Sequence, residues 1–272
     1  MMIDTHTHLN FNAYKTDLDA VIRRTLDNDL GMINVGSQYE TSQKAVAIAE
    51  KYPDGVYAAV GLHPIHLTEG IFKVKLDEEE SAFQTKNEDF HYEKYKKLAE
   101  SEKVVAIGEI GLDYYYRPKT KTKLNQFKER QKEVFLKQLA LAEELNLPVI
   151  FHCRSAHQDL IEILDGQKTA QGVIHCFTGD WQQAEKYLAM GFYLGFNGII
   201  FKLNLDEVIE KAPLERILIE TDCPYLTPPP MTGRNEPLYV KYVAEKIAEI
   251  RKLRYEEISV ITTENAKKLF KL

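Results

Sequence analysis

The sequence is poor in cysteine: its 272 residues include only Cys153, Cys176 and Cys223. Such an odd, sparse set does not form the disulfide framework of a small secreted protein and indicates a reducing compartment. The first residues, MMIDTHTHLN, carry neither the basic nor the apolar region of a secretory signal. We therefore expect a cytoplasmic protein.

Long hydrophobic runs and an excess of basic residues are also missing. No apolar stretch approaches the roughly 18 residues of a membrane-spanning helix, so we expect no membrane association. The formal net charge of -6 excludes a protein coated with basic surface. Any nucleic acid would have to be held by a local group of cations. Hydrophobic residues make up 44% of the chain, which is enough for a large core.

Short apolar segments alternate with amphipathic segments along the chain. The strand candidates are Met2–Asp4, Met32–Val35, Val56–Val60, Val104–Ile107, Val149–Phe151, Val173–His175, Phe192–Leu194 and Ile217–Ile219. The helix candidates are Asp17–Asp29, Thr41–Tyr52, Leu124–Leu145, Ala156–Asp165, Trp181–Met190, Leu205–Lys211 and Pro237–Lys252. Eight such units predict a parallel sheet closed into a (β/α)₈ TIM barrel. We expect a single domain over residues 1–272, with one or two extra helices over Glu256–Leu272 packed on the outside.

The segment Thr68–Phe90 interrupts this alternation. It contains the acidic runs LDEEE and NED and shows little periodicity. Because it follows the third strand, a barrel places it on the face that carries the active site. We interpret it as a solvated acidic loop or helix, with a lid over the site as the alternative.

Histidines and acids stand at the ends of several predicted strands. His6 and His8 lie two residues apart, so their imidazoles project together from an extended chain. This spacing suits zinc or another divalent ion. The further candidate ligands are Glu109 (in VVAIGE), His152 (PVIFH), His175 (GVIH) and Asp222 (ILIETD). The C-terminal ends of barrel strands converge on one face, so we predict a metal site there.

Other residues at this rim are candidates for substrate contact. His63, in GLHP, is interpreted as a phosphate contact or leaving-group acid, or as a turn-stabilising residue. Arg154 can clamp a phosphate or pair with a loop acid. Tyr115, in the run YYYRPKTKTK, suits stacking on a base of single-stranded nucleic acid while the cations follow its phosphates. The alternative is that these aromatic residues pack under the loop.

The remaining polar candidates have weaker signals. Arg234 and Asn235, in RNEP, are candidates for substrate binding, with Glu236 as a structural partner of either. His66 and His157 match no motif, and we expect solvated or capping roles for both. Each cysteine directly follows a candidate ligand, and strand alternation turns it away from that ligand. We therefore interpret the three cysteines as small buried fillers.

Seven sequence blocks resemble the TatD family of metal-dependent deoxyribonucleases. They are IDTHTHLN, GLHP, GEIGLDYY, FHCR, HCFTG, ETDCPYL and RNEP, and they run in order from Ile3 to Pro237. The resemblance implies a (β/α)₈ barrel and two divalent ions (Mg, Mn or Zn). It implies DNA as the substrate, single-stranded or at its ends, hydrolysed as an exonuclease would.

Carried over motif by motif, the resemblance implies two ion positions: His6, His8 and Asp222 on one ion, His152 and His175 on the other, and Glu109 as the bridge. A water between two such ions becomes hydroxide near neutral pH. Asp222 can orient that water or accept its proton. We expect Asp4 to orient an imidazole N–H from behind.

Two other functions stay open. One is hydrolysis of a small amide, ester or lactone, or of an aminoacyl-tRNA ester, on the same barrel. Many two-metal amidohydrolases use a carboxylated lysine as bridge, so Glu109 favours the nuclease. The other is a non-catalytic scaffold, against which the complete ligand set argues. We expect a monomer.

Overall fold

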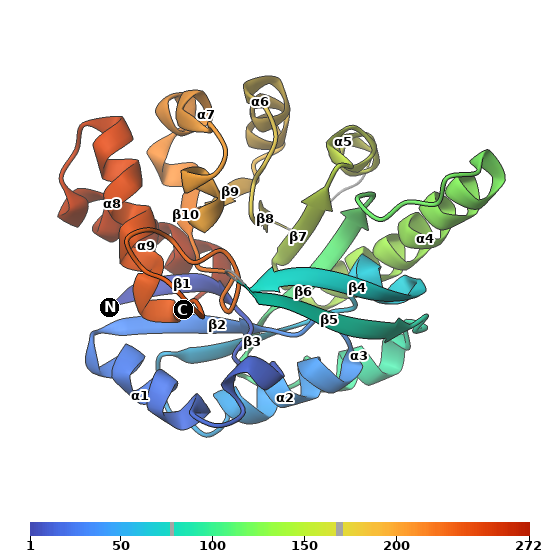
Figure 1. Cartoon of the computed structure of the whole chain (residues 1–272), viewed down its shortest axis with the longest axis horizontal. Helices are drawn as coiled ribbons and strands as arrows, with labels where there is room; N and C mark the ends of the chain where they lie inside the picture. Colours follow the sequence, from blue (N-terminus) through green and yellow to red (C-terminus); the bar gives the residue numbers. More distant parts are fainter. Residues whose placement is uncertain (77–78, 167–170) are drawn as a thin grey trace.

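Eight parallel strands form a nearly closed barrel at the centre of the molecule (Figure 1). The computed structural model describes residues 1–76, 79–166 and 171–272. In sheet order the strands are β1 Met2–Thr7, β2 Leu30–Val35, β3 Val56–Val60, β6 Val104–Asp113, β7 Val149–Arg154, β8 Gly172–Ile174, β9 Tyr193–Phe196 and β10 Ile217–Ile219. The (β/α)₈ barrel expected from the sequence is therefore confirmed.

Helices surround these strands (Figure 1). They are α1 Leu18–Asp27, α2 Tyr39–Ala49, α3 Tyr92–Leu98, α4 Lys121–Leu145, α5 His157–Asp165, α6 Trp181–Ala189, α7 Asp206–Lys211, α8 Val240–Arg251 and α9 Tyr255–Phe270. Short 3-10 helices cover Asn12–Tyr14, Pro64–Leu67, Gly198–Phe201, Leu214–Arg216 and Pro237–Tyr239. Apolar side chains such as Ile22, Leu139 and Ile247 join strand residues in one buried cluster, which anchors the helices to the barrel. Helix α3 is absent from the helices predicted from the sequence.

The C-terminal helix covers one end of the barrel instead of lying outside it. Leu269 and Phe270 of α9 pack on a buried cluster that includes Ile33 and Ile150 from the strands. Asn265 donates hydrogen bonds to the carbonyl groups of residues 214 and 217, where β10 begins. The helix therefore lies at the N-terminal ends of the strands. The opposite, C-terminal rim is the end where barrel enzymes place their sites.

The segment Thr68–Phe90 contains an antiparallel hairpin, which corrects the expected loop or helix. Its strands are β4 Glu69–Leu76 and β5 Glu79–Lys86, paired from Glu69 opposite Lys86. Residues 77–78, within the acidic run, lie outside the described residues. The alternation of apolar residues with lysines in FKVKL (72–76) is a strand pattern that the neighbouring acids obscured.

Side chains help to close the seam between β1 and β10. An isolated parallel β-bridge also joins the backbones of Thr7 and Cys223. The buried carboxylate of Asp4 accepts hydrogen bonds from the N–H and the hydroxyl of Thr221, at 2.9 and 2.5 Å. Its contact with His6 is to the backbone N–H. Asp4 therefore ties two strands together and does not orient an imidazole, contrary to the expectation from the sequence.

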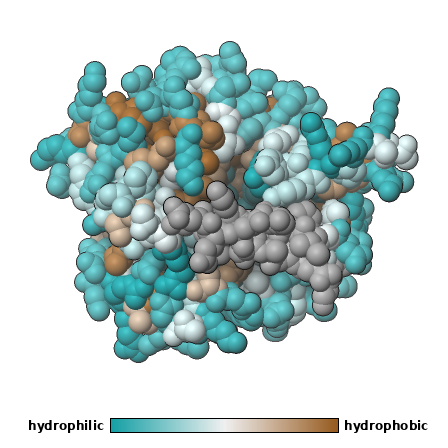
Figure 2. Space-filling view, in the orientation of Figure 1, coloured by the Kyte–Doolittle hydropathy of each residue, from teal (hydrophilic) through white to brown (hydrophobic). Residues whose placement is uncertain are grey.

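None of the described helices has both the length and the apolar composition of a membrane span. Outside the grey atoms, the face shown in Figure 2 is largely hydrophilic.

The Thr221→Val substitution tests the seam. Loss of the hydroxyl leaves a buried Asp4 oxygen without its donor, which should lower the free energy of unfolding by about 1–3 kcal/mol. Urea unfolding in EDTA measures this loss. Thr25→Val is the matched control, because the Thr25 hydroxyl bonds only to a carbonyl within α1. Equal losses in the two variants would argue against a role for the Asp4 contact.

Candidate metal centre

Six side chains predicted as ligands meet at the C-terminal rim of the barrel. They are His6 and His8 at the end of β1, Glu109 in β6, His152 in β7, His175 directly after β8, and Asp222 after β10. His6, His8, Glu109 and His175 are buried, whereas His152 and Asp222 are partly accessible. The C-terminal ends of five strands thus bring their polar side chains to one place.

The Glu109 carboxylate stands at the centre of the cluster. Its Oε2 lies 3.6 Å from His6 Nε2 and 3.8 Å from His8 Nε2. Its Oε1 lies 2.6 Å from His152 Nδ1 and 3.7 Å from His175 Nε2. Each oxygen therefore faces a different pair of histidines, as required of a carboxylate placed between two ions.

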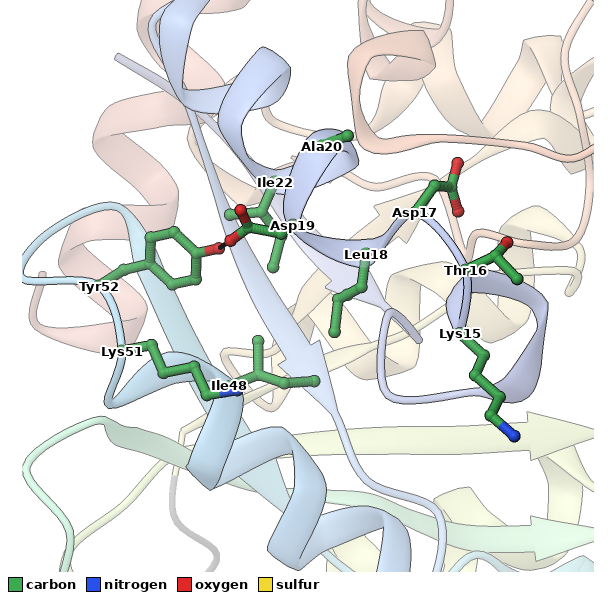
Figure 3. Close-up of a pocket in the computed structure, with 10 residues that line it drawn as sticks. All are labelled: Lys15, Thr16, Asp17, Leu18, Asp19, Ala20, Ile22, Ile48, Lys51 and Tyr52. Carbon is green, nitrogen blue, oxygen red and sulfur yellow. Dashed lines mark hydrogen bonds between the residues drawn. The ribbon is translucent and has the colours of Figure 1, made fainter.

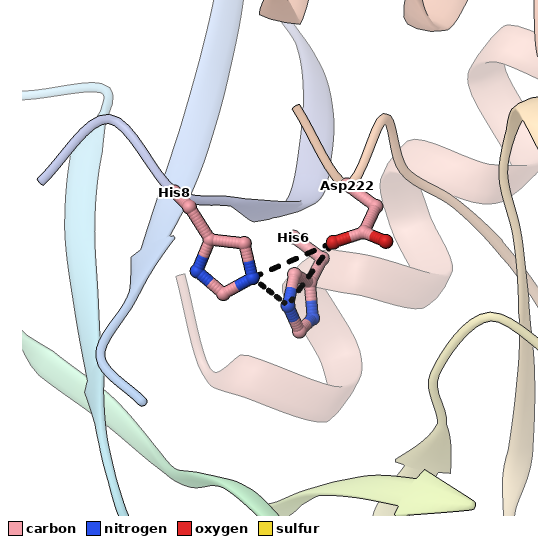
Figure 4. A group of neighbouring side chains, drawn as sticks. All are labelled: His6, His8 and Asp222. Atoms are coloured by element: carbon pink, nitrogen blue, oxygen red, sulfur yellow. Dashed lines mark hydrogen bonds and ion pairs between the residues drawn. The ribbon is translucent and has the colours of Figure 1, made fainter. Parts of the chain in front are cut away.

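Asp222 adds a second carboxylate beside His6 and His8 (Figure 4). Its Oδ1 lies 3.4 Å from His8 Nε2 and 3.9 Å from His6 Nε2, and the two Nε2 atoms are 3.2 Å apart. Asp222 adopts a left-handed φ of 57°, and its N–H donates to the His6 carbonyl at 2.9 Å. Three potential ligand atoms therefore face one point.

Irregular strand pairing accompanies two of the ligand positions. The β1–β2 register shifts between Asp4 and Thr7, the stretch that contains His6. The β6–β7 register shifts between Gly108 and Ile110, on either side of Glu109. Such irregularities re-aim side chains that regular alternation would point elsewhere. They accompany the orientation of His6 and Glu109 towards the cluster.

The hydrogen-bond partner of Nδ1 decides which ring nitrogen of His8 and of His63 carries the proton. A histidine whose Nε2 is unprotonated can bind an ion, whereas one whose Nε2 carries the proton can only donate a hydrogen bond there. His8 Nδ1 lies 2.9 Å from the Val35 carbonyl, which can only accept, so the proton is on Nδ1 and the lone pair of Nε2 faces the cluster. His63 is the reverse: its Nδ1 accepts from the Ile65 N–H at 3.0 Å, so a neutral ring carries its proton on Nε2. That Nε2 lies 3.5 Å from Glu109 Oε1. His63 therefore presents a hydrogen-bond donor to the site.

Two carboxylates that the sequence analysis missed stand behind the other histidines. Asp113 Oδ2 lies 3.2 Å from His152 Nε2, and Glu220 Oε1 lies 2.8 Å from His175 Nδ1. Asp113 lies in the motif GEIGLDYY with Glu109, and Glu220 lies in ETDCPYL with Asp222. Membership in these motifs was the available signal.

These acids control the protonation of the ion-free site. Burial by itself lowers the pKa of His152, but the carboxylates of Glu109 and Asp113 outweigh it and raise that pKa to about 9. Burial also opposes the charge of His175, whose pKa Glu220 and Asp222 raise to about 10. Burial raises the pKa of Glu109, yet the surrounding imidazoles hold it well below its ordinary value. A metal ion binding here must displace imidazole protons.

The donor set fits divalent cations. Ligand atoms of His6, His8 and Asp222 lie within 4.8 Å of one another. Imidazole and carboxylate together suit zinc, manganese and related ions, and this mixture does not select one of them.

Cys176 departs from the expected orientation. The prediction was that strand alternation turns it away, but β8 ends at Ile174 and Cys176 has a left-handed φ of 44°. Its sulfur lies within 4.8 Å of ligand atoms of His175 and Asp222. Cys153 and Cys223 are buried, as expected of fillers.

The remaining candidates divide between the rim and the interior. The Arg154 guanidinium lies 3.7 Å from the ring centroid of Tyr115, and both residues are exposed. Arg234 instead makes a bidentate ion pair with Asp17, at 2.8 and 2.6 Å. The buried Asn235 amide donates to the carbonyl groups of residues 221 and 225. Arg234 and Asn235 hold the loop that follows Asp222, and we do not retain them as substrate contacts.

His66 and His157, for which solvated or capping roles were expected, are buried rather than solvated. His66 Nε2 lies 3.4 Å from the Ser37 hydroxyl. His157, the first residue of α5, contacts Cys153 and Tyr187 through Nδ1. Both imidazoles pack against neighbouring elements, and a sequence motif does not show such contacts.

A cavity of about 480 Å³ lies between the start of α1 and the end of α2, and none of the six clustered residues lines it (Figure 3). Its acids are already paired: Asp17 with Arg234, and Asp19 with Arg23 and Tyr52. We therefore place the functional site at the rim cluster.

Comparison with known proteins identifies the class. The family model described as "TatD related DNase" matches residues 3–271. A metal-dependent hydrolase of Bacillus subtilis, YabD, is 44% identical, with 100% of both chains covered. A protein of Pantoea vagans named "3'-5' ssDNA/RNA exonuclease TatD" is 34% identical, again with 100% of both chains covered. The crystal structure of a TatD homologue from Escherichia coli K12 superimposes with a TM-score of 0.83 at 31% identity, covering 100% of this chain and 98% of the other.

Fold, site and relatives together define a metal-dependent hydrolase that acts on ester bonds. The chain belongs to the TatD family.

Metal binding at the cluster should stabilise the fold. An ion held only by the native state adds about 2.7 kcal/mol to the free energy of unfolding at a concentration 100-fold above its Kd. We expect Mn²⁺ to raise the urea midpoint, and Glu109→Ala to lose most of this increment. Glu185→Ala, at an exposed position of α6, is the control and should keep it. A full increment in Glu109→Ala would contradict a central role for Glu109.

Proposed function

We propose that this protein is a divalent-metal-dependent deoxyribonuclease that hydrolyses DNA from an end, with two ions at the rim cluster. The observation that carries the proposal is the position of Glu109, whose two oxygens face separate pairs of histidines. His6, His8 and Asp222 would hold one ion, and His152 and His175 the other. The name of the Pantoea relative supports a nucleic acid as substrate and an end as the point of attack.

The ions, when bound, would supply an activated water and neutralise charge on the phosphodiester. The chain's own groups fit complementary roles. Asp222 is partly accessible beside His8 and can orient the attacking water or accept its proton. His63 presents Nε2–H towards the cluster and can donate to a phosphate or leaving-group oxygen.

An exposed aromatic and cationic surface next to the cluster supports the choice of substrate. Tyr115 is 56% exposed and stacks with Arg154, and its N–H is bonded to Asp113, the partner of His152. Tyr116 is exposed as well, whereas Tyr114 is buried. Exposed cations follow along the chain at Arg117, Lys119, Lys121 and Lys123. Rings for bases and cations for phosphates are what a single strand needs, even on a protein of net charge -6.

The three cysteines are free. We keep a reducing cytoplasm as the proposed place of action for this reason.

The first test is hydrolysis of labelled single-stranded DNA with Mg²⁺, Mn²⁺ or Zn²⁺, beside aryl esters. EDTA should abolish DNA hydrolysis and added metal should restore it, because the water needs an ion to become hydroxide. Glu109→Ala should show no turnover above the EDTA level, while Glu185→Ala stays active. Blocking the 3' or the 5' end of the strand reports the end of attack.

Turnover of aryl esters without turnover of DNA would replace the nuclease with a hydrolase of small esters. DNA binding that survives EDTA with no turnover in any assay would indicate a scaffold.

The second test is Tyr115→Ala. Stacking of a base on an aromatic ring contributes roughly 1–3 kcal/mol, so KM for single-stranded DNA should rise about 5-fold to 150-fold with a smaller change in kcat. Tyr57→Ala is the control, because a cation, Lys103, also lies over the Tyr57 ring, but Tyr57 stands near the start of β3, at the opposite end of the barrel. An unchanged KM in Tyr115→Ala would remove this surface from the binding site.

A further inference from the structure

The two halves of the cluster differ in what stands behind their histidines. His152 and His175 each contact a carboxylate through the ring nitrogen that points away from the centre, Asp113 at 3.2 Å and Glu220 at 2.8 Å. Both acids are buried, with 5% and 0% of their surface exposed. Asp113 makes a hydrogen bond to His152, whereas Glu220 lies at ion-pair distance from His175 Nδ1 without hydrogen-bond geometry. Both carboxylates place negative charge behind the rings.

The other half lacks this support among the described residues. His8 Nδ1 donates to a neutral carbonyl, that of Val35. The buried Nδ1 of His6 has no hydrogen-bond partner within the described part of the chain. Glu220 comes within 4.8 Å of a ring nitrogen of His6, but no hydrogen bond joins them. The carboxylates that form ion pairs with the His6 and His8 rings among the described residues are Glu109 and Asp222, which face the ring nitrogens on the ion side.

We propose that Asp113 and Glu220 are positioning residues that make the ion position beside His152 and His175 the tighter of the two. A carboxylate on the far nitrogen holds the proton there and makes the ligating nitrogen a stronger donor. Loss of such a partner typically weakens metal binding about 10-fold to 100-fold. The inference rests on the two-ion site of the proposed function.

Substitutions of the two acids should weaken metal binding by different amounts. Glu220 Oε1 faces His175 Nδ1, the Cys176 N–H and the Asn197 amide, whereas the buried Oε2 has no hydrogen-bond partner among the described residues. Glu220→Gln can therefore keep the hydrogen bonds from the Cys176 N–H and the Asn197 amide and lose the charge that faces His175. Asp113 uses Oδ1 for the Tyr115 N–H and Oδ2 for His152. With its oxygen kept on Tyr115, Asp113→Asn turns an N–H donor towards His152 and opposes the required tautomer.

The experiment is a Mn²⁺ titration of the full chain, with free Mn²⁺ counted by electron paramagnetic resonance. Wild type should bind two ions in two resolved steps. His8→Asn should keep the tight step and His152→Asn should lose it, which assigns each step to a half of the cluster. Asp113→Asn should weaken the tight step by about 100-fold and Glu220→Gln by about 10-fold.

Asp159→Asn is the matched control. Asp159 also accepts hydrogen bonds near the rim, from Tyr114 and Lys128, but no contact with a clustered histidine is found among the described residues. It should leave both steps unchanged. Circular dichroism of each metal-free variant checks that the chain is folded, and a misfolded variant is replaced by Asp113→Ser or Glu220→Asp.

The outcomes separate the two proposals. Fewer than two ions on wild type would overturn the two-ion function, and this inference with it. Two ions of equal affinity, or a tight step that is lost in His8→Asn, would overturn this inference alone. So would Asp113→Asn and Glu220→Gln variants that bind both ions as wild type does.

Discussion

A buried carboxylate among imidazoles is the constraint on which this structure depends. Glu109 is 4% exposed, and an unpaired charge in such a place costs several kcal/mol. Nitrogens of five histidines, residues 6, 8, 63, 152 and 175, lie within 3.8 Å of its oxygens. They come from β1, the turn after β3, β7 and the end of β8. Compensation of one charge therefore requires half of the barrel to be in place.

At the seam between β1 and β10, the same hydrogen bonds close the barrel and bring the candidate ligands together. The N–H of Asp222 bonds to the His6 carbonyl, and the N–H of His8 bonds to the Cys223 carbonyl. These bonds join the ends of β1 and β10 through residues that are ligand candidates or their neighbours. Asp4 and Thr221 secure the same seam one layer below. A chain that leaves the seam open would also separate Asp222 from His6 and His8.

The sequence predicted the strands and the six-residue cluster because both depend on local patterns. Strand segments such as Val56–Val60 agree with the structure residue for residue, and the polar groups follow them. The acids behind the ligands, such as Glu220, were not predictable in this way. The contact of Glu220 with His175 depends on the curvature of the sheet, which brings together the ends of β8 and β10, two strands apart. Cys176 was misplaced because alternation ends where β8 ends. Arg234 was a candidate for substrate binding because a motif does not show its ion pair with Asp17.

Under the proposed function, the charge of the site would allow an acidic protein to bind a polyanion. Four carboxylates surround the cluster: Glu109, Asp113, Glu220 and Asp222. Without ions they are compensated by protonated imidazoles such as His152 and His175, whose pKa values lie near 9 and 10. Two divalent ions would balance the four carboxylates and leave the imidazoles neutral. Under the proposed function, a phosphate would then meet a site without excess negative charge, and Arg154 and the lysines beyond Tyr115 would attract it.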